Sequence, residues 1–309
     1  MQVEEELAGF SPQRDMLLTI GVFDGVHLGH RHLISRLVSQ ARQQNLLSGV
    51  VTFYQHPRAI VAGASLPFLA DPEERSQFLK GEGVDAVILL SFTVQLAELS
   101  IRQFADLLQK HLRMRGLVIG PDFAAGRGRE GDIDTLRKVG EEMGFSVTTV
   151  SPLVINGEVV SSTLIRKAVA EGDMGKVARL AGHPYSLHGQ VVSGTGRGAG
   201  LGFPTANLDI DQNQAIPADG VYASWAYVDG NAYQSMTNIG ICPTFGGCER
   251  TAEIFLLDYQ GDLYGHELKV EIIERLRDEV KFDSVAELQK QVAEDVKRGK
   301  AILAARSQN

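Results

Sequence analysis

Cysteine and long apolar runs are both scarce in this chain of 309 residues. Its two cysteines, Cys242 and Cys248, are too few for a disulfide framework or a structural zinc site and favour a reducing compartment. Apolar runs such as residues 87–90 are far too short to cross a bilayer, and the N-terminus is acidic where an export signal would be basic. We therefore predict a cytoplasmic protein that has no membrane partner.

Positive charge is also in deficit. Lysine and arginine number 30 against 38 aspartates and glutamates, which gives a formal net charge of −8. Because such a field repels polyanions, a nucleic-acid partner is not expected. A site for small phosphate compounds then needs local helix N-termini, backbone amides or a metal ion. The sequence contains no G-x-x-x-x-G-K-[ST] motif, so P-loop chemistry is not predicted.

The length favours two domains, and the hydrophobic pattern changes accordingly. Over residues 17–150, short apolar runs alternate with segments of helical periodicity. Continuous apolar strands separated by helices predict a doubly wound parallel α/β sheet, with ligands at the carboxyl ends of its strands. Two short helices, near residues 162–171 and 173–180, complete this domain. We place it at residues 1–182.

The period of the pattern changes to two after residues 182–184. Several strand-like runs, separated by turns such as residues 229–230, predict an antiparallel β-barrel. The last stretch, about residues 284–306, has apolar residues at helical intervals and predicts a C-terminal helix that packs on the barrel. The second domain then spans residues 183–309.

The sharpest local pattern of the first half is GVFDGVHLGH, residues 21–30, between the first strand and the first helix. Gly25 and Gly29 allow the backbone to approach a ligand closely. His27 and His30, together with helix amides, can donate hydrogen bonds to phosphate oxygens. The pattern favours a polyphosphate site over a pair of histidines that only cap a helix or fill a core.

These ten residues resemble the H-x-G-H signature of the nucleotidylyltransferase superfamily, in the FDG form typical of bacterial FAD synthetases. The resemblance implies that both histidines contact ATP phosphates and act in catalysis. Residues 161–166, SSTLIR, are similar to a second motif of that family, where hydroxyls, amides and an arginine hold the triphosphate. The ATP-binding residues implied in this half are Phe23, Asp24, Gly25, His27, His30, Ser162, Thr163 and Arg166.

Three substitutions depart from the family pattern. Tyr54 stands where an acidic residue is usual, Ala124 where the D-F-R-F-G motif has arginine, and Leu164 where a further arginine is frequent. Asp122 is retained, and the resemblance implies that it belongs to the flavin-binding loop. Residues 126–131 match G-x-G-x-x-G only formally, because they lie too far from a strand for a tight turn. We interpret them as a mobile loop over a ligand.

The second half contains a glycine-rich sequence that ends in PTAN, residues 204–207. Thr205 and Asn207 lie two residues apart and therefore on one side of an extended segment. Their oxygens suit Mg²⁺ held jointly with ATP phosphates. A plain flexible loop is the alternative interpretation. The glycines whose amides are expected to wrap phosphate include Gly194, Gly196 and Gly198.

The PTAN segment resembles the signature of riboflavin kinases, and further motifs continue this similarity across the domain. In that family the threonine and asparagine bind Mg²⁺ and nucleotide, which implies these roles for Thr205 and Asn207. The family's catalytic glutamate lies in a following strand, and the resemblance implies Glu253 as the general base. By alternation alone, Glu253 would be an ordinary residue of an exposed face.

Two other features of this half bear on the flavin and on the phosphates. The motif LRDEVKF, residues 276–282, resembles the family pattern, and we assign flavin binding to Arg277 and Phe282. Cys242 stands where the family usually has an arginine, and Arg250 is a candidate to compensate for that charge.

Together the resemblances imply an enzyme that makes FAD from riboflavin. ATP would phosphorylate riboflavin to FMN in the C-terminal domain, and a second ATP would adenylylate FMN in the N-terminal domain with release of pyrophosphate. The implied cofactor is Mg²⁺, with ATP as co-substrate and the flavins riboflavin, FMN and FAD as substrates or products. Beyond these small molecules we expect a monomer or a transient homo-oligomer.

Two alternatives remain open at this point. The substitutions at Tyr54, Ala124 and Leu164 also fit a riboflavin kinase whose N-terminal domain only binds its ligand. The other alternative is a flavin-binding or NAD-linked redox protein. The missing dinucleotide fingerprint after the first strand argues against that class.

Overall fold

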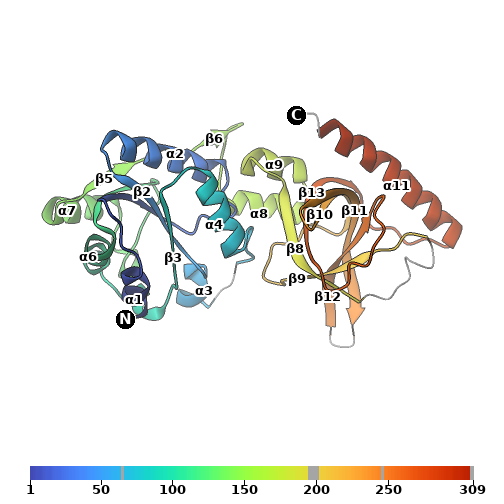
Figure 1. Cartoon of the computed structure of the whole chain (residues 1–309), viewed down its shortest axis with the longest axis horizontal. Helices are drawn as coiled ribbons and strands as arrows, with labels where there is room; N and C mark the ends of the chain where they lie inside the picture. The colour runs from blue at the N-terminus through green and yellow to red at the C-terminus, as the bar shows by residue number, and fades with distance from the viewer. Residues whose placement is uncertain (64–65, 194–201, 245–246, 307–309) are drawn as a thin grey trace. The chain divides into compact units, whose positions relative to one another are not determined.

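The computed structural model describes residues 1–63, 66–193, 202–244 and 247–306. The chain forms two compact units, Met1–Ser162 and Thr163–Asn309, which can be followed in Figure 1. Each unit has its own sheet and its own buried apolar core.

The first unit is built on a parallel sheet with the strand order β3-β2-β1-β4-β5. Every pairing in this sheet is parallel. Because the chain moves outward from β1 on both sides, the winding reverses between β1 and β4, which is where such sheets bind ligands. The strands are β1 (Met16–Ile20), β2 (Leu47–Phe53), β3 (Ala86–Leu90), β4 (Met114–Ile119) and β5 (Ser146–Thr149).

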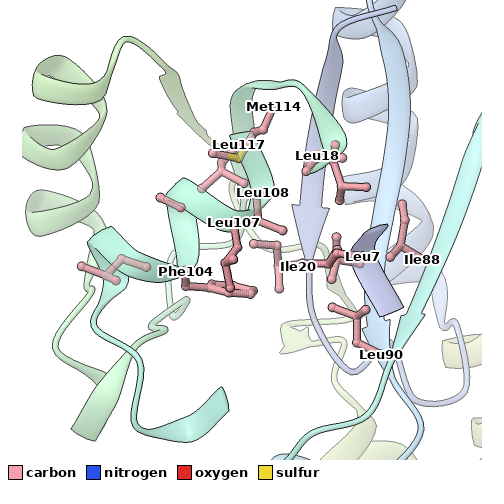
Figure 2. Close-up of a cluster of buried hydrophobic side chains, with 14 of the residues drawn as sticks. Leu7, Leu18, Ile20, Ile88, Leu90, Phe104, Leu107, Leu108, Met114 and Leu117 are labelled. Carbon is pink, nitrogen blue, oxygen red and sulfur yellow. The ribbon is translucent and has the colours of Figure 1, made fainter. Parts of the chain in front are cut away.

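Helices cover both faces of this sheet, since successive residues of a strand point to opposite sides. Leu17 of β1 packs in one cluster with Ile34 and Leu79 from two of the helices. Its neighbour Leu18 packs on the other face in the cluster of Figure 2, with Phe104 among its members. The helices are α2 (Leu28–Gln43) and α4 (Pro72–Gly81) on the first face, and α1 (Gln2–Ala8), α6 (Ile101–Leu112) and α7 (Ile133–Met143) on the second.

Side chains at the helix N-termini fix where these helices begin. Asp71 accepts hydrogen bonds from the amides of Glu73 and Glu74, and Pro72 occupies the first position of α4. Ser100 and Gln103 form a reciprocal capping box at the start of α6. The shorter elements are α3 (Pro57–Val61), α5 (Val94–Ala97), the 3₁₀ turn η1 (Arg127–Arg129) and the hairpin of β6 (Val154–Ile155) and β7 (Glu158–Val159).

The second unit is a closed antiparallel barrel with the strand order β10-β11-β12-β9-β8-β13. Each strand pairs with two neighbours, and every pairing is antiparallel. Closure leaves no free sheet edge. The strands are β8 (Tyr185–Val192), β9 (Ala206–Ile210), β10 (Gly220–Val228), β11 (Asn231–Thr244), β12 (Gly247–Leu256) and β13 (Glu267–Arg277).

Two helices, α8 (Ser162–Glu171) and α9 (Met174–Ala181), precede the barrel and pack on it. The amide of Ala218 donates to the carbonyl of Val169, and a Cβ on Gly172 would lie 2.9 Å from the Tyr222 hydroxyl. By these contacts α8 and α9 lie with the second unit, whereas the sequence pattern attached them to the first domain. The predicted division into domains of residues 1–182 and 183–309 remains a prediction.

Helix α11 (Val285–Arg306) packs on the outer face of β10, β11 and β13. A Cβ on Gly299 would lie 2.3 Å from the terminal methyl of Met236, so a larger residue at this crossing would require that flexible side chain to move. On the opposite side of the same strands, the Ser224 hydroxyl lies 2.8 Å from that of Ser235 and 2.7 Å from that of Thr237. These buried hydroxyl groups satisfy one another inside the barrel.

The structure confirms the predicted fold class: a parallel α/β domain, an antiparallel barrel and a C-terminal helix. Helix α1 and strand β9 were not among the predicted elements. Strand β9 was missed because it follows a proline within a motif that was interpreted only as a metal- and phosphate-binding segment.

Candidate functional site

The first candidate site begins with a strained turn between β1 and α2. Phe23 and Val26 adopt positive φ angles of 51° and 34°, and Gly25 lies between them at 75°. A positive φ is costly for a β-branched residue such as Val26, and strain of this kind concentrates at functional sites. Gly29 is also required, because a Cβ there would lie 3.0 Å from the carbonyl oxygen of Val160.

The two histidines of this turn stack on one another. His27 is the N-cap of α2, and its Nδ1 accepts a hydrogen bond from the amide of His30 at 3.2 Å. When this imidazole is neutral, its proton is therefore on Nε2. The two rings lie 3.6 Å apart at an interplanar angle of 15°, and Phe23 meets His30 edge-on at 5.1 Å. This packing presents both imidazoles as one rigid group at a helix N-terminus.

Burial, the charge of His27 and the charge of Arg75 lower the pKa of His30 well below its usual value. The Nδ1 atom of His30 is buried and has no hydrogen-bond partner among the described residues. The neutral form therefore predominates at pH 7, and a neutral imidazole can donate a hydrogen bond to a ligand.

Asp24 connects the turn to the chain segment just before α4. Its carboxylate accepts hydrogen bonds from the amides of Leu69 and Ala70 at 2.9 and 3.2 Å. The carbonyl of Asp24 accepts a hydrogen bond from the Ser162 hydroxyl at 3.0 Å. The structure thus brings the first residue of α8 to the H-x-G-H turn, across 138 residues of sequence. Thr163 and Arg166 follow in the second unit, and their part in ATP binding stays a prediction.

A cavity of about 710 Å³ opens beside this turn, at the carboxyl ends of the parallel strands. Phe53 ends β2, and Phe92 and Asp122 follow β3 and β4. Most of the wall is apolar, which suits a flat aromatic ligand, and a few charged side chains are available to orient it. The lining residues with aromatic or charged side chains are Phe53, His56, Arg58, Phe92, Phe104, Asp122, Phe123 and Arg129.

The loop of residues 122–131 forms one wall of this cavity. Ala125 and Gly131 close this loop on itself by an antiparallel bridge, and the amide of Arg127 attaches it to the domain by donating to the carbonyl of Leu99 at 2.8 Å. The predicted loop over a ligand therefore lies at the cavity. Ala124 is also part of the wall, while Tyr54 is 49% exposed and does not line it.

The second candidate site lies on the outer face of the barrel. In β12, Ala252 and Ile254 are buried and Glu253 between them is half-buried on the opposite side. Strand register places Glu253 directly between Asn207 of β9 and Asn238 of β11. Paired residues of neighbouring strands share one face of a sheet, so a carboxylate and two amides meet here. The exposed-face placement and the catalytic role predicted for Glu253 are therefore compatible.

Thr205 comes two residues before Asn207 and adjoins the same face. Phe203 and Phe255 meet edge-on beside it, with ring centroids 5.5 Å apart. The Nδ2 of Asn238 donates to Oε1 of Glu279 at 3.2 Å, which draws the segment after β13 toward this face. Asn238 was not among the predicted site residues, although its motif was noted; only the strand register reveals its position. Gly194, Gly196 and Gly198 lie outside the described residues.

The guanidinium of Arg277 is engaged in contacts within its own domain. Its Nε contacts Oδ1 and Oδ2 of Asp295 on α11 at 3.1 and 2.9 Å, and its Nη2 contacts Oδ2 at 2.8 Å. Its Nη1 donates to the carbonyl of Asp278, and its guanidinium lies 5.7 Å from the ring centre of Phe282. This pair connects the end of β13 to α11. Flavin contact by Arg277 and Phe282 stays a prediction, whereas the connecting role is visible in the structure.

Arg250 is also fully engaged. Its Nε donates to Asp219 at 3.0 Å, and its Nη1 donates to the carbonyl of Ile216 at 3.1 Å. Its Nη2 contacts Asp219 and the carbonyl of Pro217. These bonds secure the segment before β10, so compensation for Cys242 would require Arg250 to give them up. The side chain of Cys242 lies outside the described part of the structure.

Comparisons with known proteins agree with both halves of this geometry. Residues 10–164 match the family model of FAD synthetase, and residues 181–303 match that of riboflavin kinase. A bifunctional riboflavin kinase/FMN adenylyltransferase of Escherichia coli K12 is 39% identical over 288 residues, covering 92% of each chain. Its counterpart in Pseudomonas fluorescens is 35% identical and covers 98% of each chain.

A solved structure gives the same fold over the whole length. A crystal structure described as a macrolide-efflux protein from Streptococcus pneumoniae superimposes with a TM-score of 0.88 at 30% identity and covers 97% of each chain. None of the described helices of the present chain has the length and hydropathy that a bilayer crossing requires.

Fold and sites together define a two-domain flavin nucleotide transferase, with a nucleotidylyltransferase-type α/β domain and a riboflavin kinase barrel. The chain belongs to the family of bifunctional riboflavin kinase/FMN adenylyltransferases.

Proposed function

We propose that this chain makes FAD from riboflavin in two ATP-dependent steps. Family membership carries both activities, because the matched models cover the α/β domain and the barrel separately. One observation supports the assignment of a site to each activity: each unit has its own cluster of polar side chains. In the first unit these are the stacked histidines at a helix N-terminus, and in the second they are Asn207, Glu253 and Asn238 on one face of the barrel. A redox function is not favoured.

In the barrel, Glu253 accepts the proton of the riboflavin 5′-hydroxyl as that oxygen attacks the γ-phosphorus of ATP. ADP leaves and FMN remains. Asn207 and Asn238 flank Glu253 on either side by strand register, which places two amides next to the base. Arg277, fixed by Asp295, and Phe282 beside it are proposed to border the flavin.

The donor set at the start of β9 fits Mg²⁺. A threonine hydroxyl and an asparagine carbonyl oxygen, two residues apart beside a carboxylate, are the hard oxygen ligands that this ion takes along with phosphate oxygens. Thr205 and Asn207 would hold it, and when bound it would neutralise charge on the ATP phosphates. Wrapping of these phosphates by Gly194, Gly196 and Gly198 is part of the same proposal.

In the α/β domain, a phosphate oxygen of FMN attacks the α-phosphorus of ATP, and pyrophosphate leaves. His27 and His30 donate hydrogen bonds to the phosphate oxygens, and the N-terminus of α2 adds its backbone dipole. We place the flavin ring in the cavity of about 710 Å³ beside the turn, with Asp122 at its wall. Phe23, Asp24, Gly25, Ser162, Thr163 and Arg166 are proposed to complete the ATP site.

One assay tests both steps. Purified protein is incubated with Mg²⁺, ATP and either riboflavin or FMN, and FMN, FAD and pyrophosphate are quantified chromatographically and enzymatically. We expect FMN and then FAD from riboflavin, and FAD with stoichiometric pyrophosphate from FMN. Formation of FMN without any FAD would instead identify a kinase whose α/β domain only binds ligand. The cytoplasmic location and the monomeric or transiently oligomeric state remain predictions beside this function.

A further inference from the structure

Arg75 is a buried charge that the two-step mechanism does not use. It lies on α4 and is only 3% exposed. Its Nη2 donates to the carbonyl of Phe53, the last residue of β2, and its Nε has no hydrogen-bond partner among the described residues. A buried guanidinium loses its hydration, so its presence requires a compensating arrangement or a functional reason.

The surroundings of Arg75 belong to the adenylyltransferase site. Burial lowers the pKa of Arg75, while the nearby carboxylates of Asp24 and Asp71 raise it. Asp24 is the residue of the H-x-G-H turn that anchors the amides of Leu69 and Ala70, just before α4. Phe53 lines the cavity beside the turn. Arg75 therefore stands where the turn, α4 and the carboxyl end of β2 meet.

A second connection between β2 and the turn supports this junction. The Thr52 hydroxyl, on the residue before Phe53, donates to the carbonyl of Val22 at 2.9 Å. Thr52 is fully buried. Two successive residues at the end of β2 are therefore fixed by hydrogen bonds. Thr52 bonds to the turn, and Phe53 accepts a bond from Arg75 of α4.

Resting on the proposed function, we propose that Arg75 is a positioning residue for adenylyl transfer. Its guanidinium attaches the carboxyl end of β2 to α4 and, through its interaction with Asp24, stabilises the turn that carries His27 and His30. The imidazoles are thereby held for the phosphates of ATP while the adjacent cavity wall is held for the flavin.

Arg75 also acts on His30 through its charge. The pKa of His30 is lowered by burial first, then by His27 and then by Arg75. The charged groups around this pair are His27 and Asp24 from the turn and Asp71 from the start of α4. Removing the cation of Arg75 raises the pKa of His30, so protonation and loss of the neutral donor begin at a higher pH.

Two variants separate the hydrogen bond from the charge. Arg75→Gln keeps a donor for the Phe53 carbonyl and removes the charge, whereas Arg75→Lys keeps the charge. Lys80→Met, on the exposed side of the same helix, is the matched control. For each full-length protein we measure kcat and KM for ATP in FAD formation between pH 5 and 8, riboflavin kinase activity as internal standard, FMN binding and thermal unfolding.

We expect Arg75→Gln to lower kcat for FAD formation roughly tenfold to a hundredfold, with FMN binding and kinase activity retained. The acid limb of its pH profile should move to higher pH, because the pKa of His30 rises when the neighbouring cation is removed. Arg75→Lys should recover the wild-type acid limb and part of kcat, and Lys80→Met should match wild type.

Wild-type kcat and pH profile in Arg75→Gln overturn the proposal. Equal loss of kcat in the Gln and Lys variants, together with loss of FMN binding, also overturns it, because that result identifies a purely structural residue. If Arg75→Gln does not fold, a reduced kcat in folded Arg75→Lys with FMN binding retained and a wild-type pH profile is the supporting result, and an unchanged kcat or a shifted profile overturns the proposal. Absence of FAD formation by wild type would refute the proposed function itself and this inference with it.

Discussion

The two sites of this chain are made by different means. The site of the α/β domain depends on one turn in which Phe23, Gly25 and Val26 hold positive φ angles, and its two histidines stack within three residues of each other. At the centre of the barrel site, the described residues Asn207, Asn238 and Glu253 show no comparable strain, and Glu253 acquires its two neighbours from the register of three strands. The first site is therefore sensitive to backbone conformation, and the second to strand pairing and to what secures the strands.

The largest expected effect separates the two chemical steps. Glu253→Gln keeps the shape of the residue and removes the base, so riboflavin kinase turnover should fall by roughly 10²–10⁴-fold while FMN adenylylation is unchanged. Chromatographic rates for both steps measure this. Glu267→Gln, at an exposed position of β13, serves as control. Unchanged FMN formation in Glu253→Gln would exclude this residue as the base.

The reciprocal change is at the stacked histidines. The double substitution His27→Ala and His30→Ala removes two donors and the N-cap of α2, and FAD formation from FMN should fall by roughly 10²–10³-fold. Riboflavin kinase activity in the same protein should stay at its wild-type rate. Equal loss of both activities would contradict the separation of the sites.

Stability of the barrel should depend on the pair that joins it to α11. Asp295→Ala leaves the guanidinium of Arg277 without its carboxylate partner in a largely buried position, and we expect a loss of about 3 kcal/mol in the unfolding free energy of the second domain. Denaturant unfolding followed by kinase activity measures it. Glu274→Ala breaks a surface pair with Arg306 and should cost less than about 1 kcal/mol. Similar losses of unfolding free energy in both variants would show that the buried pair stabilises the domain no more than the surface pair does.

A smaller effect tests the strained turn. Gly25→Ala places a Cβ 3.0 Å from that of Leu69 at a φ of 75°, and should destabilise the first domain by about 1–2 kcal/mol. Gly83→Ala has a similar φ of 79° with nothing within 4 Å of the added Cβ. Thermal unfolding of the two variants, compared side by side, isolates the cost of the contact with Leu69. The contact is unimportant if both variants unfold at the same temperature.

The smallest effect concerns alkaline pH. Burial, followed by the hydrogen bond to Glu271, raises the pKa of Tyr227 to about 12, from an ordinary value of 10.0. Because the folded state binds this proton more tightly, its contribution to stability is fully present below pH 10 and is lost as the pH rises toward 12. Tyr227→Phe should therefore lose stability less steeply between these values, as followed by circular dichroism. Identical pH dependence in both proteins would exclude Tyr227 as a contributor.

Much of the fold could be predicted from the sequence because its signals are local. Continuous apolar strands and helical periodicity indicated a parallel sheet, and the change to a period of two indicated the barrel. Helix starts are also local features, since caps such as Asp71 and Ser100 act within three residues of chain. His27 and His30 were found for the same reason: turn, glycines and helix N-terminus lie within ten residues.

The remaining site features involve residues that are distant in the sequence. Nothing local indicates that Asn238 flanks Glu253, that Asp295 holds Arg277, or that the Ser162 hydroxyl reaches Asp24. Strand register, helix docking and loop closure bring these groups together, and each depends on the packing of the whole domain.

The sequence by itself determined the architecture of each half and indicated the candidate reactive groups, because periodicity, caps and short motifs act over a few residues. Tertiary structure decided the rest. It selected which face of the barrel Glu253 shares with Asn207, placed the cavity at the ends of the parallel strands, and buried Arg75 near His30 and Asp24. These outcomes rest on contacts between distant segments, whose free energy is gained only when the complete core has formed.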